Sequence, residues 1–397
     1  MIVALVSVLS LGIWAYLLLA RGRFWRCDER DDTLPLLPRE TKVGDALHAW
    51  PSVTAVVPAR DEAATIAHTI LSLLRQDYAG RFSVVLVDDQ SSDDTAAIAS
   101  AAAKALGAAS QLAIVTGMNI PPGWTGKLWA MRQGLAAVEN VATPSEFILF
   151  TDADIAYEPQ ALRRLVEIAL VRESVLTSLM VKLRCESLAE HLLVPAFVFF
   201  FQKLYPFAWV NDPARATAAA AGGCMLARCD VLKSAGGLEA VRGALIDDCA
   251  LGALMKKRGP VWLGLTESVH SLRAYPAFGD FRRMVVRSAF AELRYSTLNL
   301  IATVAGMALI YLVPPLMTLF AHGAAQAAGA IAWAMMAVAF APTLRFYGRP
   351  VLFGLALPAI AAVYTGFTIE SAWQYWRGRG GHWKGRFQAS AKGAGGA

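Results

Sequence analysis

Two carboxylates one residue apart, Asp152 and Asp154, directly follow a short apolar stretch at residues 147–151. A run this short and this uniformly apolar is typical of a parallel strand that is covered on both faces. Ligands of open parallel sheets bind just beyond the carboxyl ends of such strands. Two aspartates at this spacing could close around one hard divalent cation and the phosphate oxygens that it carries. Alternatively, the pair forms only a turn and a helix cap.

A regular alternation of strands and helices leads up to this stretch. Strands are predicted at residues 53–57, 83–87, 112–116 and 147–151, and helices between them at 62–76, 94–106 and 127–140. Such strand–helix–strand units of about thirty residues form right-handed crossovers and a parallel sheet. The amino-terminal half is therefore predicted to be a nucleotide-binding type of α/β domain.

Polar side chains also follow the first two strands. They are Pro58, Arg60, Asp61 and Glu62 after the first strand, and Asp88 and Asp89 after the second. Some of the acids nearby have structural explanations, because Asp93 or Asp94 is a good N-cap. Capping does not explain the accumulation, since carboxylates that converge on one sheet edge repel unless a cation or the donors of a ligand compensate them.

These motifs, in this order, resemble the inverting, nucleotide-sugar-dependent glycosyltransferases of family 2, which have the GT-A fold. The resemblance rests on residues 58–62, the run from Asp88 to Thr95, Gly126-Lys127 with Gly134, and Asp152-x-Asp154. It covers roughly residues 50 to 295. It implies a Rossmann-like α/β catalytic domain at 51–296 that uses a nucleotide-diphosphate sugar donor, with a UDP-sugar expected.

The resemblance also implies roles for single residues. Asp61, Glu62 and Asp89 would contact the uridine or ribose. Asp152 and Asp154 would hold Mg2+ or Mn2+ on the diphosphate. Lys127 would help to neutralise or orient the diphosphate, although a lysine that begins a helix could equally be merely solvated.

A second acidic pair, Asp247 and Asp248, opens a predicted helix downstream of the flexible Gly222-Gly223 step. Family 2 places an acidic pair here whose second member deprotonates the acceptor hydroxyl, so the resemblance assigns that base to Asp248. Inversion by direct displacement requires a base on the face opposite the departing diphosphate. The alternative is that both acids only cap the helix.

The Q-x-x-R-W motif of many processive members is absent from residues 281–290, so a processive polysaccharide synthase is not expected. Arg282, Arg283 and Arg287 would instead lie largely on one helix face. They could bind the leaving diphosphate or hold the helix against lipid headgroups. The residues expected to bind the nucleotide sugar are Pro58, Arg60, Asp61, Glu62, Asp88, Asp89, Lys127, Asp152, Asp247, Arg283 and Arg287.

Membrane segments are expected because the 397 residues are 56% hydrophobic, which is too apolar for a purely soluble enzyme. Residues 1–20 are apolar and are followed by Arg21, Arg23 and Arg26. This pattern predicts a transmembrane anchor with its carboxyl end in the cytoplasm. A cleaved signal peptide is the alternative, but its basic n-region is missing.

Further spanning segments are predicted within residues 297–371, near 298–320, 324–343 and 351–370. The predicted protein is therefore a multi-pass membrane protein with a cytoplasmic catalytic domain. Three carboxyl-terminal spans would place the basic tail at 372–397 outside, against the usual bias. Either one segment is re-entrant or interfacial, with the Pro358 segment the first candidate, or the bias fails here.

Three other stretches complete the predicted organisation. Residues 21–50 are expected to be a linker, and the tail at 372–397 to be partly disordered. The apolar run at 194–201 is too short to span but is rich in aromatics, so residues 190–210 could form a helix in the membrane surface or a core helix of the catalytic domain.

Net charge and cysteine content indicate which partners and which redox compartment to expect. The net charge is +6, and the basic residues cluster beside apolar stretches, so an anionic membrane surface is expected as a partner and nucleic acid is not. The five cysteines are odd in number and lack metal-ligand spacing, which indicates buried thiols in a reducing compartment. They are Cys27, Cys185, Cys224, Cys229 and Cys249.

A second resemblance is more specific. The anchor, the Trp124–Lys127 loop, the Arg294-Tyr295-Ser296 sequence and the Gly-His-Trp-Lys-Gly-Arg tail resemble the hopene-associated glycosyltransferases found with bacterial hopanoid biosynthesis genes. This resemblance implies metal-dependent transfer of a sugar to a hydroxyl of a membrane lipid, with a hopanoid as the expected acceptor, in the inner membrane of a bacterium. A polyprenyl-phosphate glycosyltransferase and a non-catalytic membrane scaffold are the alternatives, and the intact acids weigh against the scaffold.

Overall fold

The computed structural model describes residues 2–33, 50–140, 144–383 and 386–389. The chain divides into two compact units, which are described separately below. The sheet unit contains Glu29–Arg184 and Trp209–Arg273, and the helical unit contains Met1–Asp28, Cys185–Ala208 and Ala274–Ala397. The stretch expected to form the catalytic domain, residues 51–296, is therefore shared between the two units.

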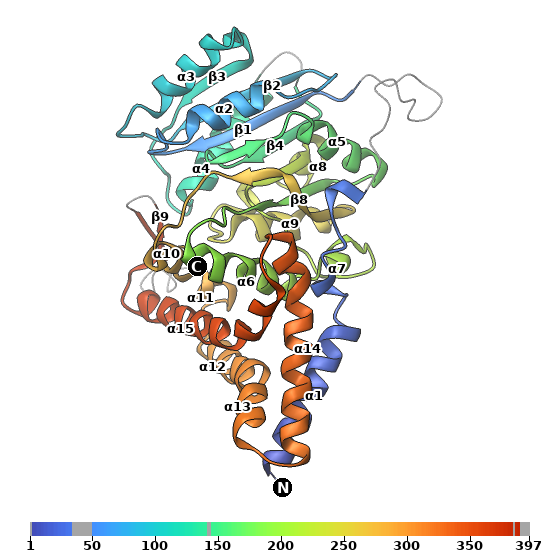
Figure 1. Ribbon diagram of the computed structural model, residues 1–397. Helices are drawn as coiled ribbons and strands as arrows, with labels where there is room; N and C mark the ends of the chain where they lie inside the picture. The colour runs from blue at the N-terminus through green and yellow to red at the C-terminus, as the bar shows by residue number, and fades with distance from the viewer. Residues whose placement is uncertain (1, 34–49, 141–143, 384–385, 390–397) are drawn as a thin grey trace. The chain divides into compact units, whose positions relative to one another are not determined.

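The sheet unit is built on one eight-stranded sheet with the strand order β3-β2-β1-β4-β7-β6-β8-β5 (Figure 1). The strands are β1 (Val53–Ala59), β2 (Phe82–Asp88), β3 (Leu112–Thr116), β4 (Phe147–Thr151), β5 (Ile155–Tyr157), β6 (Leu176–Lys182), β7 (Cys224–Arg228) and β8 (Val261–Ser271). β1 to β4 run parallel to one another, whereas β7 is antiparallel to both β4 and β6. β8 is parallel to β6 and antiparallel to β5. The sheet is thus wholly parallel in its first half and mixed in its second half.

The predicted alternation of strands and helices is confirmed in that parallel half. The helices between its strands are α2 (Ile66–Leu74), α3 (Thr95–Ala105) and α4 (Gly126–Glu139). The predicted start of the first helix at residue 62 is wrong. Asp61 takes a left-handed backbone conformation with φ of 51°, and a turn follows it before the helix begins.

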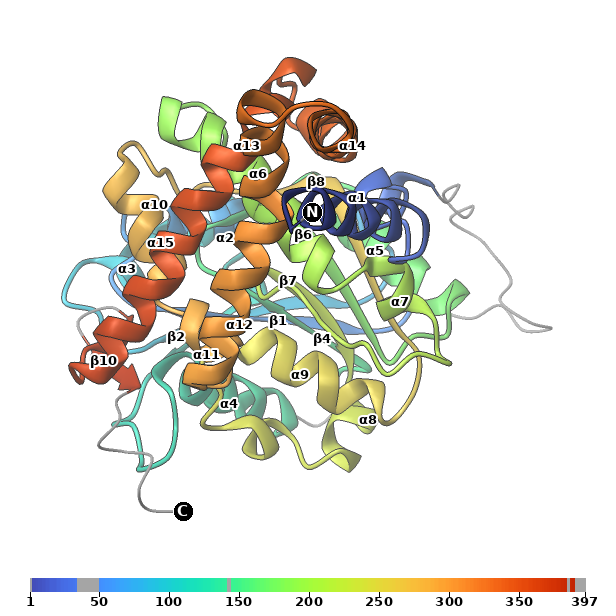
Figure 2. The same cartoon turned by 90° about the horizontal axis from the view of Figure 1, so that it is seen from below.

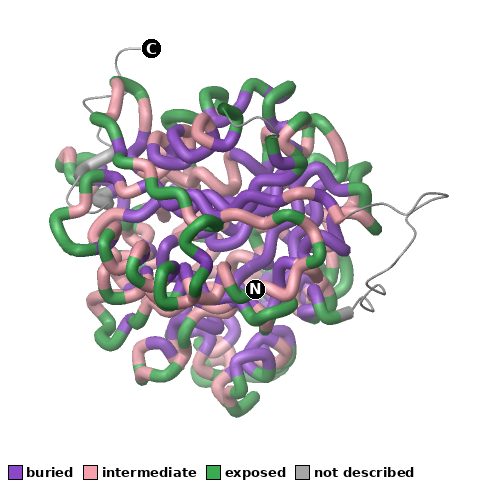
Figure 3. The backbone as a smooth tube through the Cα atoms, turned by 90° about the horizontal axis from the view of Figure 1, so that it is seen from above, coloured by how far each residue is buried: buried purple, intermediate pink, exposed green. Residues whose placement is uncertain are grey.

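Helices cover both faces of the parallel strands. Buried residues of α2 and α3 pack in one cluster with Val53, Ala55 and Val57 of β1. α4 packs on β1 and β2, where a Cβ atom on Gly134 would lie 2.4 Å from Cγ1 of Val56. All residues of β1 and β4 are buried, as expected for strands covered on both faces. In Figure 3 the buried backbone runs through the interior, and the exposed residues lie mainly on outer loops and helices.

The remaining helices of the sheet unit accompany the second half of the sheet, and α5, α8 and α9 contact its strands. They are α5 (Ala161–Val171), α8 (Cys229–Ser234), α9 (Asp247–Lys256), and α7 (Phe207–Asn211), which begins at the boundary of the unit. α9 approaches the backbone that leads into β7 very closely. A Cβ atom on Gly252 would lie 2.7 Å from the carbonyl carbon of Ala219 and 3.0 Å from the amide nitrogen of Ala220.

Within the part of the chain that the structure describes, four helices are long and apolar enough to cross a membrane, as predicted, and all four belong to the helical unit. They are Ile2–Leu19, Thr297–Phe320, Ala324–Phe346 and Val351–Trp376. Its helices are α1 (Ile2–Leu19), α6 (Leu188–Leu204), α10 (Phe278–Val286), α11 (Ala289–Glu292), α12 (Thr297–Met307), α13 (Val313–Phe320), α14 (Ala324–Phe346) and α15 (Leu357–Trp376). α1 lies beside α14, as Figures 1 and 2 both show.

A π-helical turn at Ala308–Leu312 joins α12 to α13. Its displaced carbonyl groups accept hydrogen bonds from α1. Ser10 Oγ donates to the Leu309 carbonyl at 2.9 Å, and Trp14 Nε1 donates to the Ile310 carbonyl at 2.8 Å. These bonds satisfy backbone groups that an apolar environment would leave without water.

Residues 190–210 form most of α6, which contacts α10, α14 and α15 within the helical unit. A capping box starts the helix, since Ser187 Oγ accepts from the Glu190 amide and Glu190 Oε2 accepts from the Ser187 amide. The helix is therefore grouped with the apolar helices, and its place at a membrane surface stays a prediction.

The ends of the chain are only partly described. Residues 34–49 of the predicted linker and residues 384–385 and 390–397 of the tail lie outside the described residues. The start of the predicted tail is helical, since α15 continues to Trp376. A small antiparallel pair of strands follows, β9 (Gly380–Trp383) and β10 (Arg386–Ala389). All five cysteines are described and are free thiols. Cys27 and Cys224 are buried, and the other three are partly buried.

The close approach of α9 predicts that Gly252→Ala destabilises the protein. The added methyl group would meet backbone atoms, which must move apart, so we expect the free energy of unfolding to fall by about 1–3 kcal/mol. Thermal unfolding in detergent measures this. Gly306→Ala in α12, where the methyl group would meet nothing within 4 Å, should change stability little. Equal melting temperatures for Gly252→Ala and wild type would contradict the packing described.

Candidate active site

The candidate site lies at one edge of the sheet. Because β1, β2 and β4 are parallel, the residues that follow them emerge at the same edge. Asp61, Asp89 and Asp152 all follow strands of this group. β7 is antiparallel to β4, so its first residue, Cys224, pairs with Thr151 at the same edge. The glycines that precede β7 therefore reach the site as well.

The loops after β1 and β2 are joined by hydrogen bonds. Asp61 Oδ1 accepts from the amide and the hydroxyl of Ser92 at 2.7 and 3.0 Å. The Asp61 amide donates to Ser91 Oγ at 3.0 Å, and the Glu62 amide donates to Thr95 Oγ1 at 2.9 Å. The acids of the two motifs are thus held in one rigid loop pair.

Arg60 and Asp89 form the buried side of this loop pair. Arg60 Nη1 donates to the Asp89 carbonyl at 2.7 Å, and the same nitrogen lies 3.9 Å from Asp89 Oδ2. Asp89 is completely buried. Among the described residues, the buried Nε of Arg60 has no hydrogen-bond partner, although it lies 3.8 Å from Asp61 Oδ2. A buried donor without an acceptor costs free energy, which a ligand acceptor at this position would recover.

Two further residues predicted to bind the donor, Asp88 and Pro58, have structural roles in the loop and in the strand. Asp88 Oδ1 accepts from the Ser91 amide at 3.1 Å. Pro58 is buried within β1, in register with Val87. Pro58 therefore shapes the strand end, and nothing in its position assigns it a polar contact.

Lys127 is the centre of an ionic cluster. It lies in the first turn of α4, and its Nζ is 2.8 Å from Asp152 Oδ1 and 3.2 Å from Asp247 Oδ2. Burial alone would lower the pKa of Lys127, but the charges of Asp152 and Asp247 raise it well above its usual value. Burial also raises the pKa of Asp152, and Lys127 offsets part of that rise. Lys127 is therefore a fixed positive charge beside Asp152.

Asp248 lies next to this cluster and is held by backbone amides. Its Oδ2 accepts from the Gly222 amide at 2.9 Å, and its Oδ1 accepts from the Cys249 amide at 2.8 Å. A Cβ atom on Gly222 would lie 3.2 Å from both Asp248 Oδ2 and Lys127 Nζ, so only glycine leaves this space open. Burial and the neighbouring charge of Asp247 raise the pKa of Asp248 to about 6. A carboxylate with such a pKa is suited to accept a proton near neutral pH.

Asp154 has a cationic partner that the sequence did not reveal. Its side chain is 9% exposed and accepts from Nε of Arg273. Arg273 Nη2 also donates to Glu62 Oε1 at 2.8 Å. β8 brings this arginine to the site, because its last residue, Ser271, pairs with Ile155 of β5. A basic residue just after a strand gives no sequence signal for this pairing, which depends on the antiparallel register.

The two carboxylates of the Asp152-x-Asp154 motif fit a magnesium or manganese site of a particular kind. Over residues 2–33, 50–140, 144–383 and 386–389, no three His, Cys, Asp or Glu side chains are grouped to hold a metal ion. Mg2+ at phosphate sites, however, takes one or two carboxylates and completes its shell with phosphate oxygens and water. Asp152 and Asp154 meet that requirement.

Two arginines predicted to bind the nucleotide sugar lie on or just after α10, in the helical unit. Arg283 pairs with Asp280, and Arg287 follows the end of the helix and is exposed. The neighbouring Arg282 forms a two-bond ion pair with Glu370 of α15, at 2.7 and 2.5 Å. Arg282 therefore joins two helices, while diphosphate binding by Arg283 and Arg287 stays a prediction.

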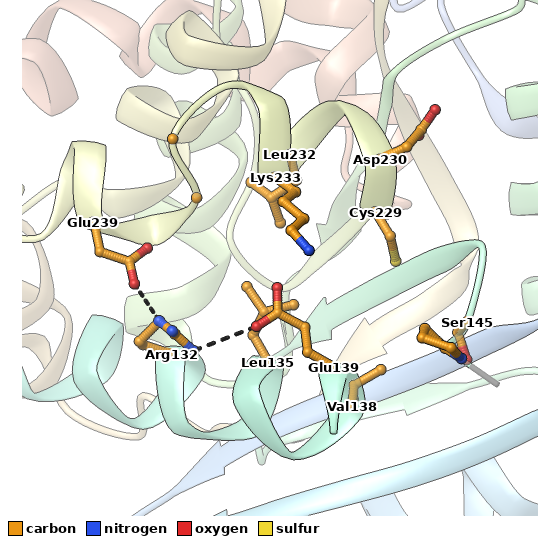
Figure 4. Close-up of a pocket in the computed structure, with 13 residues that line it drawn as sticks. Arg132, Leu135, Val138, Glu139, Ser145, Cys229, Asp230, Leu232, Lys233 and Glu239 are labelled. Atoms are coloured by element: carbon orange, nitrogen blue, oxygen red, sulfur yellow. Dashed lines mark hydrogen bonds and ion pairs between the residues drawn. The ribbon is translucent and has the colours of Figure 1, made fainter. Parts of the chain in front are cut away.

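A cavity of about 460 Å³ in the sheet unit lies elsewhere, between α4 and α8. Its lining includes Ser145, just before β4, and Cys229, just after β7, so it opens at the edge of the sheet opposite to the candidate site. Figure 4 shows Arg132 between Glu139 and Glu239, with which it forms ion pairs. None of the predicted site residues lines this cavity.

The sheet, with acidic residues at the carboxyl ends of its parallel strands, is of the α/β type that binds nucleotides. The family described as "Glycosyltransferase like family 2" matches residues 51–263. Since the match covers more than half of the chain, the protein belongs to this glycosyltransferase family and has the GT-A fold. Among curated proteins, none matches the chain.

One solved structure has a similar fold, and two others match with TM-scores below 0.5. Mannosyltransferase PcManGT from Pyrobaculum calidifontis, in complex with GDP-Man and Mn2+, has a TM-score of 0.53 and 18% identity, and the match covers 94% of this chain and 98% of that chain. Mannosyl-3-phosphoglycerate synthase from Rubrobacter xylanophilus has a TM-score of 0.43 and 19% identity, over 69% and 84% of the chains. Glucosyl-3-phosphoglycerate synthase from M. tuberculosis has a TM-score of 0.37 and 22% identity, over 61% and 80%.

The ionic cluster predicts a pH-dependent stability effect of Lys127→Met in metal-free buffer. Without the ammonium group, the acids around it repel, and we expect a lower melting temperature than wild type at pH 8. Because the pKa of Asp248 is raised on folding, the folded state binds more protons than the unfolded state, and lowering the pH through 6 relieves the repulsion. The deficit should therefore shrink at pH 5.

The matched control is Lys104→Met, which removes an exposed lysine of α3. Its melting temperature should follow that of wild type at both pH values. A deficit of Lys127→Met that is the same at pH 5 and pH 8 would show that the acids around Lys127 do not repel as described.

Proposed function

We propose that the enzyme transfers a sugar, with inversion, from a nucleotide-diphosphate donor to a hydroxyl group of a membrane lipid. The observation that carries the proposal is the position of Asp248. A carboxylate with a pKa of about 6 lies across Gly222 from the Lys127–Asp152 pair. A proton acceptor is thus placed beside a fixed positive charge, which is what inverting transfer to a hydroxyl needs.

The donor we propose is a UDP-sugar. The joined loops after β1 and β2, with Asp61, Asp89 and the unsatisfied Nε of Arg60, would hold the nucleoside. Asp152 and Asp154 would hold Mg2+ or Mn2+, which when bound supplies positive charge to the diphosphate. The family match supports a nucleotide-sugar donor. PcManGT, whose fold is similar, is described with GDP-Man and Mn2+, so a GDP-sugar is the competing donor.

The residues of the chain would then act in a defined order. Asp248 accepts the proton of the acceptor hydroxyl, and the hydroxyl oxygen attacks the anomeric carbon of the donor sugar. The bond from that carbon to the diphosphate oxygen breaks on the opposite face, and the leaving diphosphate keeps the electron pair. Lys127 stabilises this developing negative charge from a fixed position.

A lipid acceptor is supported by the four helices that could cross a membrane. With these helices, we propose an enzyme of the bacterial inner membrane whose catalytic domain is cytoplasmic. The second resemblance favours a hopanoid hydroxyl as the acceptor. The alternatives are a polyprenyl phosphate acceptor and a scaffold without catalysis.

Calorimetric titration tests the donor and the metal together. UDP and, separately, GDP are titrated into detergent-solubilised protein with and without Mn2+. We expect Mn2+ to strengthen binding of UDP at least tenfold in wild type, and the double variant Asp152→Ala, Asp154→Ala to lose that gain. Asp230→Ala removes an exposed aspartate and should behave like wild type. Absence of binding of either nucleotide under every metal condition would contradict the proposed donor site.

The acceptor class is tested by Asp248→Asn. A lipid hydroxyl must lose its proton to be a good nucleophile, so we expect turnover to fall at least 100-fold, in the range that general-base catalysis supplies. The wild-type rate should also fall as the pH drops through about 6, because the base becomes protonated. The assay is transfer of radiolabelled sugar to extracted membrane lipid, with Asp230→Asn as the control. Largely retained turnover would instead favour an anionic phosphate acceptor, which needs no strong base.

A further inference from the structure

Arg273 bridges two carboxylates that come from different loops of the sheet unit. Its Nε donates to Asp154, which follows β4, and its Nη2 donates to Glu62, which follows β1, at 2.8 Å. The backbone beside it is held to the same aspartate, because the Leu272 amide donates to the Asp154 carbonyl at 2.7 Å. The guanidinium therefore sits at the meeting point of the two predicted ligand-binding loops.

The three side chains differ in exposure. Asp154 is 9% exposed and Glu62 is 13% exposed, whereas Arg273 is 41% exposed. The carboxylates are thus held inside the fold, while the arginine approaches them from the solvent side. A buried carboxylate needs a counter-charge, and the guanidinium of Arg273 provides it. Of the three side chains, only that of Arg273 lies on the solvent side. It can therefore move away while both carboxylates stay in place.

A divalent cation held by Asp154 requires the carboxylate that Arg273 now binds. We propose that Arg273 is the resident counter-charge of Asp154 in the nucleotide-free enzyme, and that a divalent cation arriving with a nucleotide diphosphate takes its place. This inference rests on the proposed function. The displaced guanidinium keeps its charge and can pair with diphosphate oxygens, for which its planar set of donors is well suited.

The exchange explains why metal and nucleotide should bind together. A cation alone competes with the guanidinium for Asp154 and offers it no new anionic partner, while the bond from Arg273 to Glu62 can stay in place. A cation that comes with a diphosphate brings the guanidinium a new anionic partner at the same time. Metal affinity should therefore be low without nucleotide and rise when nucleotide is present, and by linkage the reverse holds equally.

The experiment is titration of Mn2+ followed by the electron paramagnetic resonance signal of the free ion, with and without UDP. We expect wild type to bind Mn2+ at least tenfold more tightly with UDP than without it. Arg273→Gln removes the competing charge, so it should bind Mn2+ alone about tenfold more tightly than wild type does. It should also gain less from UDP than wild type gains.

Two further variants keep the test decisive. Arg228→Gln removes another arginine of the sheet unit, one that pairs with the exposed Asp230, and should bind Mn2+ like wild type. Arg273→Lys keeps the charge but cannot bridge two carboxylates as a guanidinium does, so its Mn2+ affinity should fall between wild type and Arg273→Gln. This variant replaces Arg273→Gln if the latter fails to fold, as judged by its melting temperature.

The possible failures are distinguishable. If wild type shows UDP-dependent Mn2+ binding but Arg273→Gln and Arg273→Lys bind Mn2+ alone no more tightly than wild type, the inference about Arg273 is overturned while the proposed function stands. If wild type binds no Mn2+ with UDP or with GDP, the proposed metal site is itself contradicted, and the inference falls with it.

Discussion

Carboxylates gathered at one edge of a sheet repel one another, and the candidate site depends on how that repulsion is balanced. Asp152 and Asp247 are balanced by Lys127 from the start of α4, and Asp154 and Glu62 by Arg273 from the end of β8. The side chain of Asp154 is 9% exposed and that of Asp152 is 36% exposed, so without the two cations Asp154 in particular would have to take up a proton or leave the interior. The protein therefore carries its own positive charge at two places in the site. A bound metal ion would supply positive charge there, and a nucleotide diphosphate would require it.

The sheet determines which charges can meet. The parallel strands β1, β2 and β4 send their acidic loops to one edge, and the antiparallel β7 returns Gly222 to that edge because Cys224 pairs with Thr151. α9 then lies close enough for Asp248 to accept from the Gly222 amide, a contact that depends on the missing side chains of Gly222 and Gly252. Small residues thus leave room for Asp248, and two backbone amides keep its carboxylate oriented. The position of Asp248 therefore depends on how closely the backbone of α9 approaches the backbone before β7.

Much of the parallel half could be predicted from sequence, because apolar runs such as residues 147–151 and their alternation with helices are local signals. The acids at the strand ends followed from the same signals, since parallel strands share a carboxyl edge. Arg273 could not be predicted, because its meeting with Asp154 depends on the register of β8 against β5. The predicted start of α2 was wrong for a local reason, because Asp61 takes a left-handed backbone conformation. The grouping of α6 with the apolar helices follows from long-range packing that an aromatic-rich run does not specify.

The most direct test of the central claim is the location of manganese by anomalous scattering, in crystals of the enzyme grown with Mn2+ and with or without UDP. If Lys127 and Arg273 are resident counter-charges, a manganese peak should lie beside Asp152 and Asp154 only when UDP is present, with the Arg273 guanidinium turned from Asp154 to the diphosphate. A peak at these aspartates without UDP, or a UDP complex in which Arg273 still binds Asp154 and no manganese is nearby, would contradict the account.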